Sequence, residues 1–166
     1  GTGSGCILLT LLAERGDAVG YGTDISPAAL NVAHWNRNAL KLEGRAEFCE
    51  GSWYGALGEM DERFDLIVSN PPYIAVNEMP FLSPEVRDHE PRLALTDEAD
   101  GLTAYHAILA GHARWLAPGG RLVAEIGASQ GMAVSKLFAR AGLRGVRVIP
   151  DIDGRDRVIV GVNSPF

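Results

Sequence analysis

The sequence predicts an α/β fold with a mostly parallel sheet, and three observations carry this prediction. Apolar segments of strand length alternate with longer segments of helical length, which is the order expected of repeated βαβ units. A glycine-rich loop at residues 1–5 opens a helical segment, as such loops do after a strand. The Asp153-Gly154 pair suits a tight turn between the last two apolar segments, which predicts one antiparallel strand.

The first half of the chain carries signals for helices and strands in alternation. Gly16-Asp17 ends the first helix. Ser26-Pro27 begins the second, because serine caps helix N-termini and proline is preorganised for the first helical position. The apolar run that begins at Phe64 is expected to be a buried strand. The predicted ranges are a helix at 6–14, a strand at 18–23, a helix at 27–42, and strands at 45–49 and 64–69.

Residues 74–100 are predicted to form a long loop. Pro80, Pro84 and Pro91 interrupt any helical periodicity, and acidic residues are frequent. A charge such as Asp97 is expected to be solvated rather than to contact a substrate. Because a loop of this length in a compact domain is usually functional or mobile, we interpret the segment as a flap that faces the substrate.

The last third of the chain returns to helices and strands. Pro118-Gly119-Gly120 predicts a sharp stop after a helix, and Gly142 suits the C-terminal cap of the next helix. The predicted ranges are a helix at 101–116, a strand at 121–126, a helix at 129–141, and strands at 144–149 and 157–162.

Composition narrows the class of protein. The chain has 166 residues, enough for one domain with a sizeable core, and its 46% hydrophobic and 22% charged residues are ordinary for a soluble globular protein. A net charge of -6 argues against a large nucleic-acid footprint. No apolar run approaches the roughly 20 residues of a membrane span. Cys6 and Cys49 are expected to be buried free thiols in a reducing compartment, and no His/Cys cluster has metal-ligand spacing.

The tetrapeptide Asn70-Pro71-Pro72-Tyr73 is the strongest candidate site. The prolines cannot donate to a sheet ladder, so the strand must stop there, at the carboxyl edge where open α/β sheets bind ligands. The Asn70 side-chain oxygen and the Pro71 carbonyl can point into one small space that the Tyr73 ring closes. That set suits a planar group with an NH2, either an amide or the exocyclic amine of a base. The alternative is an ordinary loop with helix-breaking prolines.

A second candidate site combines the glycine loop with an acidic residue. The loop Gly1-Thr2-Gly3-Ser4-Gly5 lets a ligand approach the backbone closely, and the following helix N-terminus favours polar or negative groups. Cys6 stands where a dinucleotide fingerprint has its third glycine, which counts against NAD. Asp24 ends the next strand and can accept both hydroxyls of a ribose, or can simply cap a turn. Trp53 can wall off an adenine ring or pack in the core.

The chain begins directly with a glycine turn that normally follows a strand. We therefore expect that a strand, and with it an N-terminal region, is absent from this sequence, together with any targeting signal that such a region carries.

The order of elements resembles the class I S-adenosylmethionine-dependent methyltransferases, and the motifs resemble those of the peptide chain release factor glutamine N5-methyltransferases. The likeness spans essentially the whole chain. The motifs that carry it are Gly1-Thr2-Gly3-Ser4-Gly5, Asp24, Trp53, Asn70-Pro71-Pro72-Tyr73, Glu90-Pro91-Arg92-Leu93-Ala94-Leu95, Asp100-Gly101-Leu102, Glu125-Ile126-Gly127 with Gln130, and Gly154-Arg155-Asp156-Arg157.

The resemblance implies a Rossmann-like domain over residues 1–166. Its mostly parallel seven-stranded sheet would have an antiparallel last strand, with the first strand and an N-terminal helical domain absent here. It also implies S-adenosylmethionine as cofactor, with residues 1–5 around its methionine part, Asp24 on its ribose and Trp53 beside its adenine. Asn70 and the Pro71 carbonyl would hold the substrate amide, next to the cofactor, with Pro72 and Tyr73 completing the catalytic set.

The resemblance further implies a monomeric cytoplasmic enzyme without a metal, whose partner is a class I release factor and not a membrane or a nucleic acid. Three alternatives stay open at this point. They are a glutamine methyltransferase of ribosomal protein uL3, an amino-methyltransferase acting on a nucleic-acid base, and a protein that only binds the cofactor or a partner.

Overall fold

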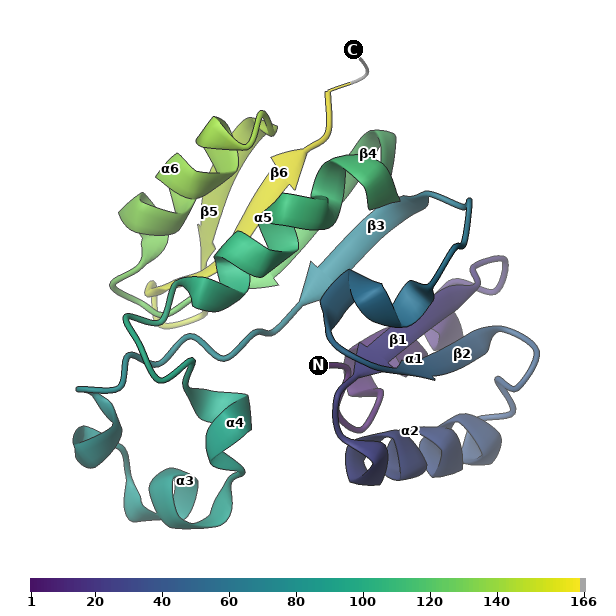
Figure 1. Ribbon diagram of the computed structural model, residues 1–166, viewed down its shortest axis with the longest axis horizontal. Coiled ribbons are helices and arrows are strands. Elements are labelled where there is room, and N and C mark those ends of the chain that lie inside the picture. The colour runs from purple at the N-terminus through teal and green to yellow at the C-terminus, as the bar shows by residue number, and fades with distance from the viewer. Residues whose placement is uncertain (165–166) are drawn as a thin grey trace. The chain divides into compact units, whose positions relative to one another are not determined.

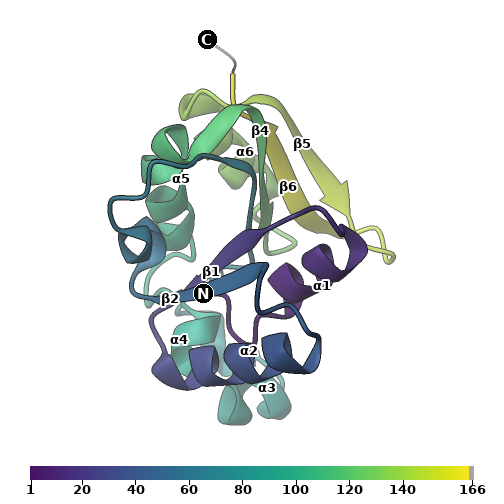
Figure 2. The same ribbon diagram turned by 90° about the vertical axis from the view of Figure 1, so that its right-hand side faces the viewer.

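The computed structural model describes residues 1–164, which fall into two units (Figures 1 and 2). The first unit is Gly1–Asp61, and the second begins at Glu62. Each unit contains its own sheet and its own helices. None of the helices within residues 1–164 is long and apolar enough to cross a membrane.

The first unit is a two-stranded parallel sheet packed against helices. Strands β1 (Gly20–Asp24) and β2 (Ala46–Glu50) pair in register, so that Asp24 lies opposite Glu50 at their carboxyl ends. Helices α1 (Cys6–Glu14) and α2 (Pro27–Ala39) pack on this pair, and a 3-10 turn, η1 (Trp53–Leu57), follows β2. The buried centre of the unit is formed by Leu9, Leu12, Leu42 and Ala46.

The predicted start of α2 at Ser26-Pro27 is confirmed. The Ser26 hydroxyl accepts a hydrogen bond of 3.3 Å from the Ala29 N–H, and Pro27 is the first residue of α2. The expectation of a buried thiol at Cys6 is wrong, because this first residue of α1 is exposed, and Cys49 is only partly buried.

The second unit is built on a four-stranded sheet with the order β3-β4-β6-β5. Strand β3 runs parallel to β4, whereas β6 is antiparallel to both β4 and β5, which confirms the predicted antiparallel last strand. Helices α5 and α6 pack on the same face of this sheet (Figure 1). The bounds are β3 Phe64–Ser69, α5 Thr103–Trp115, β4 Leu116–Glu125, α6 Gly131–Arg140, β5 Arg144–Pro150 and β6 Asp156–Val162.

The two faces of the four-stranded sheet differ in burial. Leu122 pairs with Gly161, and a Cβ added at Gly161 would lie 3.0 Å from the ring of Phe138 on α6, so these residues face the helices. On the opposite face, Leu66 and Val68 of β3 are 42% and 36% exposed. The prediction that β3 is buried is therefore wrong. In this unit β3 is an edge strand, and α5 and α6 cover only the other face.

Residues 74–100 differ most from the prediction, because they contain three short helices rather than a continuous loop. Each proline expected to break a helix instead lies at a helix start, where its missing N–H costs nothing. Pro84 is the first residue of α3, and Pro91 caps α4. A parallel bridge between Ile74 and Thr96 closes the segment at its base. The bounds are η2 Met79–Phe81, α3 Pro84–His89 and α4 Arg92–Leu95.

One further boundary and one side chain differ from their predictions. The Pro118-Gly119-Gly120 segment lies inside β4 instead of before it, because the Gly119 N–H and the Gly120 carbonyl pair with the backbone of Asn163. Asp97 is not simply solvated, since its carboxylate accepts hydrogen bonds from the N–H groups of Ala99, Gly101 and Thr103. It thereby satisfies free donors where α5 begins.

Candidate functional site

The structure places the predicted site residues in two groups, one in each unit. The first unit holds the glycine loop (Gly1–Gly5), Asp24 and Trp53. The second unit holds the tetrapeptide (Asn70–Tyr73). Among residues 1–164, no group of three or more His, Cys, Asp or Glu side chains is arranged to hold a metal ion.

Asp24 fixes the glycine loop to the end of β1. Its Oδ2 accepts a hydrogen bond of 2.7 Å from the Gly3 N–H, and its Oδ1 accepts one of 2.9 Å from the Ser26 N–H. The side chain is only 7% exposed. Both oxygens thus bind backbone donors, which makes Asp24 a capping residue. Each oxygen keeps further acceptor capacity for a ligand hydroxyl.

The loop itself is held on two sides. The Thr2 N–H donates to the Thr23 carbonyl at 2.7 Å, and the Asn36 amide of α2 donates to the Ser4 carbonyl at 2.9 Å. Gly5 has a φ of 77°, and a Cβ there would lie 3.0 Å from the Phe48 ring, so both conformation and space require glycine. A Cβ at Gly3 would meet nothing within 4 Å, which leaves the outer side of the loop open.

Trp53 follows the carboxyl end of β2, so it shares the sheet edge at which Asp24 ends β1. It is partly buried and has a φ of 49°, in the left-handed region that a bulky residue rarely adopts. Such backbone strain persists only where the surroundings impose it, and it is common at ligand sites. Packing beside an adenine stays a prediction.

The tetrapeptide directly follows β3, as predicted, because β3 ends at Ser69. Asn70 is exposed and Pro71 is buried, so the amide side chain is presented from a fixed backbone. The Tyr73 hydroxyl donates a hydrogen bond of 2.9 Å to Oε1 of Glu125, which ends β4. Arg157 of β6 lies 3.4 Å from the same hydroxyl and 3.9 Å from the Glu125 carboxylate.

These contacts determine the protonation state of the Tyr73 phenol. Burial raises the pKa of Tyr73 above its ordinary value of 10.0, the charge and hydrogen bond of Glu125 raise it further, and Arg157 opposes the rise. The phenol therefore stays protonated at neutral pH and acts as a donor and an aromatic wall, not as a base.

Sequence reasoning assigned no role to three residues that contact Tyr73 of the tetrapeptide, nor to a fourth residue that contacts two of these three. Glu125, Gln130 and Arg157 lie within motifs that carry the family resemblance, but only their positions at strand ends and at a helix start hinted at a common site. Tyr105 lies inside the predicted helix at 101–116, and nothing in its sequence position indicated a role at the site. The backbone brings all four to the carboxyl edge of β3 and β4.

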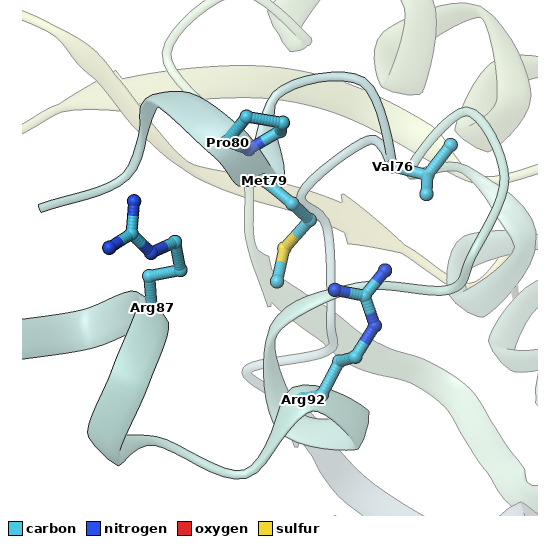
Figure 3. Close-up of a pocket in the computed structure, with 5 residues that line it drawn as sticks. All are labelled: Val76, Met79, Pro80, Arg87 and Arg92. Atoms are coloured by element: carbon cyan, nitrogen blue, oxygen red, sulfur yellow. The ribbon is translucent and has the colours of Figure 1, made fainter. Parts of the chain in front are cut away.

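A separate pocket of about 220 Å³ lies within residues 74–100 (Figure 3). Figure 3 shows Met79 between two arginine side chains, Arg87 and Arg92. Both arginines are exposed and paired, Arg87 with Asp88 at 2.7 Å and Arg92 with Glu98. Such pairs contribute little to stability. The remaining lining residues are Val76 and Pro80.

Two curated relatives match nearly the whole of this chain. The release factor glutamine methyltransferase of Cereibacter sphaeroides is 56% identical over 96% of this chain and 56% of its own length. That of Caulobacter vibrioides is 48% identical over 100% of this chain and 57% of its own length. The chain thus spans a little over half the length of these two curated relatives.

Solved structures show the same fold at low sequence identity. A methyltransferase from Pyrococcus furiosus aligns with a TM-score of 0.70 at 14% identity, over 99% of this chain and 72% of its own. The hMettl16 catalytic domain aligns with a TM-score of 0.73 at 18% identity, over 100% of this chain and 62% of its own. Residues 1–139 match the family model described as a methyltransferase domain. The chain belongs to the methyltransferase domain family, with the α/β fold that its sequence predicted.

Proposed function

We propose that the protein transfers a methyl group from S-adenosylmethionine to the side-chain amide nitrogen of a glutamine in a class I release factor. The observation that carries this proposal is the exposed Asn70 amide at the end of β3, held by a buried Pro71 and a hydrogen-bonded Tyr73. The names of the curated relatives support the same substrate.

The first unit fits the proposed cofactor. The glycine loop has open space beside Gly3 for a ligand, and the Asp24 carboxylate at the strand end retains acceptor capacity for ribose hydroxyls. Trp53 shares that edge and offers an aromatic face. When bound, S-adenosylmethionine supplies an electrophilic methyl group on a sulfonium.

The second unit supplies what an amide substrate needs. An amide nitrogen is a weak nucleophile because its lone pair is conjugated with the carbonyl. The Asn70 side-chain oxygen and the Pro71 carbonyl would each accept a hydrogen bond from the substrate NH2, which raises electron density on nitrogen and orients it. The nitrogen held in this way would take the methyl group as the bond from the methyl carbon to sulfur breaks, and one proton of the NH2 would leave to water. Positioning supplies several kcal/mol of such a barrier, on the order of 7–11 at best.

The same acceptors would serve the exocyclic amine of a nucleic-acid base, but the net charge of -6 disfavours binding to a polyanion. We place the protein in the cytoplasm as a monomer, with release factor as its protein partner. The test is to incubate it with labelled cofactor and with release factor, ribosomal protein uL3 or DNA in parallel. Label on release factor alone supports the proposal, whereas label only on uL3 or on DNA contradicts it.

A further inference from the structure

The side-chain carboxamide of Gln130 makes four hydrogen bonds, one of them to the backbone of Tyr73 in the tetrapeptide. Its Oε1 accepts from the Gly127 N–H at 2.9 Å and from the Tyr105 hydroxyl at 3.3 Å. Its Nε2 donates to the Tyr73 carbonyl at 2.9 Å and to the Gly101 carbonyl at 3.3 Å. A flipped amide would oppose donors to donors and acceptors to acceptors, so these partners fix its orientation.

The backbone around this carboxamide is packed without spare room. Gly101 has a φ of +78°, and a Cβ there would stand 2.2 Å from the Tyr73 carbonyl oxygen and 2.9 Å from Gln130 Nε2. A Cβ at Gly127 would stand 3.1 Å from Gln130 Oε1. Because Gly101 and Gly127 have no side chains, the Gln130 side chain fits between the neighbouring backbone segments. A larger residue at either position would occupy the space that Gln130 fills.

Tyr105 anchors the same cluster to β4. This side chain is fully buried, and its hydroxyl lies 2.9 Å from the Glu125 carbonyl as well as within reach of Gln130. Burial raises the pKa of Tyr105, so the hydroxyl keeps its proton and remains a donor. The Gln130 carboxamide is therefore tied to α5, to the end of β4 and to the tetrapeptide together.

We propose that Gln130 is a positioning residue for methyl transfer, which holds the Tyr73 peptide so that Asn70 and the Pro71 carbonyl are correctly aimed. The inference rests on the proposed function. Between Asn70 and Tyr73 stand two prolines with fixed φ, so the tetrapeptide is stiff, and displacement at Tyr73 is passed on to Asn70. A displacement of about 1 Å can cost about 100-fold in rate.

The test compares two substitutions of Gln130 with a charge control. Gln130→Met keeps the length of the side chain but loses both donors and the acceptor. Gln130→Glu keeps acceptors but sets a carboxylate against the carbonyls of Tyr73 and Gly101. Met132→Glu adds the same charge in the first turn of α6 at a side chain that is 73% exposed. Circular dichroism first tests whether all three variants are folded.

We expect kcat on release factor to fall about 10-fold in Gln130→Met and about 100-fold in Gln130→Glu, with KM for the release factor and affinity for the cofactor changed less than about threefold. Met132→Glu should retain the wild-type kcat. If Gln130→Glu and Met132→Glu behave alike, or if only KM changes, Gln130 has no positioning role.

Lowering the pH should partly restore the kcat of Gln130→Glu, which would not be expected if Gln130 only filled space. A protonated carboxyl regains one O–H donor, so the kcat of Gln130→Glu relative to wild type should rise as pH falls from about 8 to about 6, because two facing carbonyls raise the pKa of the new carboxyl. The kcat of Gln130→Met relative to wild type should stay flat. A flat ratio in both variants would overturn the electrostatic part of the proposal.

A measurement that does not depend on catalysis can test the role of Gln130 separately from the proposed function. In NMR spectra, the side-chain amide signal of Asn70 should shift in Gln130→Glu and Gln130→Met but not in Met132→Glu. If wild-type protein does not methylate release factor, the proposed function fails, and this signal alone decides whether Gln130 positions the tetrapeptide. An unshifted Asn70 signal in both Gln130 variants contradicts the inference whatever the activity.

Discussion

The Tyr73 hydroxyl donates a hydrogen bond of 2.9 Å to Glu125, a residue 52 positions later in the chain. The pair joins the end of β3 to the end of β4, and Arg157 of β6 binds beside it. Three adjacent strands thus hold one aromatic side chain. The ring of Tyr73 is oriented by the sheet itself and not by a loop.

Tyr73→Phe should therefore weaken the site without unfolding it. The ring remains, but the Glu125 carboxylate loses a donor in a partly buried position, which costs about 1–3 kcal/mol of unfolding free energy. We expect methyl transfer to fall about 10-fold through loosened orientation. Denaturant titration and single-turnover kinetics measure the two effects. Glu125→Gln in the Tyr73→Phe background should cost little more, and fully additive losses would show that the two residues act independently.

Asp24→Asn should weaken cofactor binding and loosen the glycine loop. The amide offers one acceptor oxygen, whereas the Gly3 and Ser26 N–H groups need two. We expect a loss of about 1–3 kcal/mol in binding, measured by calorimetry with S-adenosylmethionine. Glu50→Gln is the matched control, since Glu50 pairs with Asp24 across the strand ends and is exposed. Unchanged affinity in Asp24→Asn would rule out the ribose assignment.

Gly101→Ala should destabilise the second unit more than a positive φ alone explains. Gly101 and Gly119 share a φ of +78°, but a Cβ meets the Tyr73 carbonyl at 2.2 Å at the first site and nothing within 4 Å at the second. We expect about 1 kcal/mol for Gly119→Ala and at least about 2 kcal/mol more for Gly101→Ala. Urea unfolding of the two variants measures the difference. Equal losses would mean that the close contact with Tyr73 does not exist in solution.

Asp97 should make the unfolding free energy of the protein fall as the pH is lowered in the acidic range. Burial tends to raise the pKa of this carboxyl, but hydrogen bonds from Thr103, Ala99 and Gly101 outweigh it and hold the pKa below the ordinary 3.8. Because the pKa of Asp97 is lower in the folded than in the unfolded state, the ionised carboxylate stabilises the fold fully above about pH 3.8. This stabilisation is lost as the pH falls through the pKa of Asp97 in the folded protein.

We expect Asp97→Asn to flatten the fall in unfolding free energy below about pH 4, measured by urea titrations between about pH 2 and pH 6. The exposed Glu90→Gln in the same segment should leave that curve unchanged. An Asp97→Asn variant that still loses stability as steeply as wild type would show that other carboxylates carry the effect.

Sequence patterns predicted the elements of this fold well because their signals are local. Ser26-Pro27 begins α2, and the prolines of the tetrapeptide end β3, through the chemistry of those residues alone. The prolines of residues 74–100 were misread because proline both breaks a helix interior and starts a helix. Only the neighbouring residues and the Ile74 to Thr96 bridge decide between the two.

The candidate site was predictable only in part. Asn70 and Asp24 stand out because a polar residue at a strand end has few structural reasons to be there. Gln130 and Arg157 gave no such signal, since each reaches the tetrapeptide through a contact with Tyr73, which lies more than 50 residues away in sequence. Such contacts depend on the order of strands in the sheet, which local patterns do not encode.

In the proposed reaction, Asn70 holds a glutamine amide for methylation. The most direct measurement is mass spectrometry of release factor after incubation with wild type, Asn70→Ala and the exposed control Asn77→Ala. We expect one methyl group on a glutamine side chain with wild type and Asn77→Ala. With Asn70→Ala we expect at least about 100-fold slower transfer, because an oriented acceptor of this kind contributes about that much. Near-normal turnover by Asn70→Ala, or a methyl group on any residue other than glutamine, would contradict it.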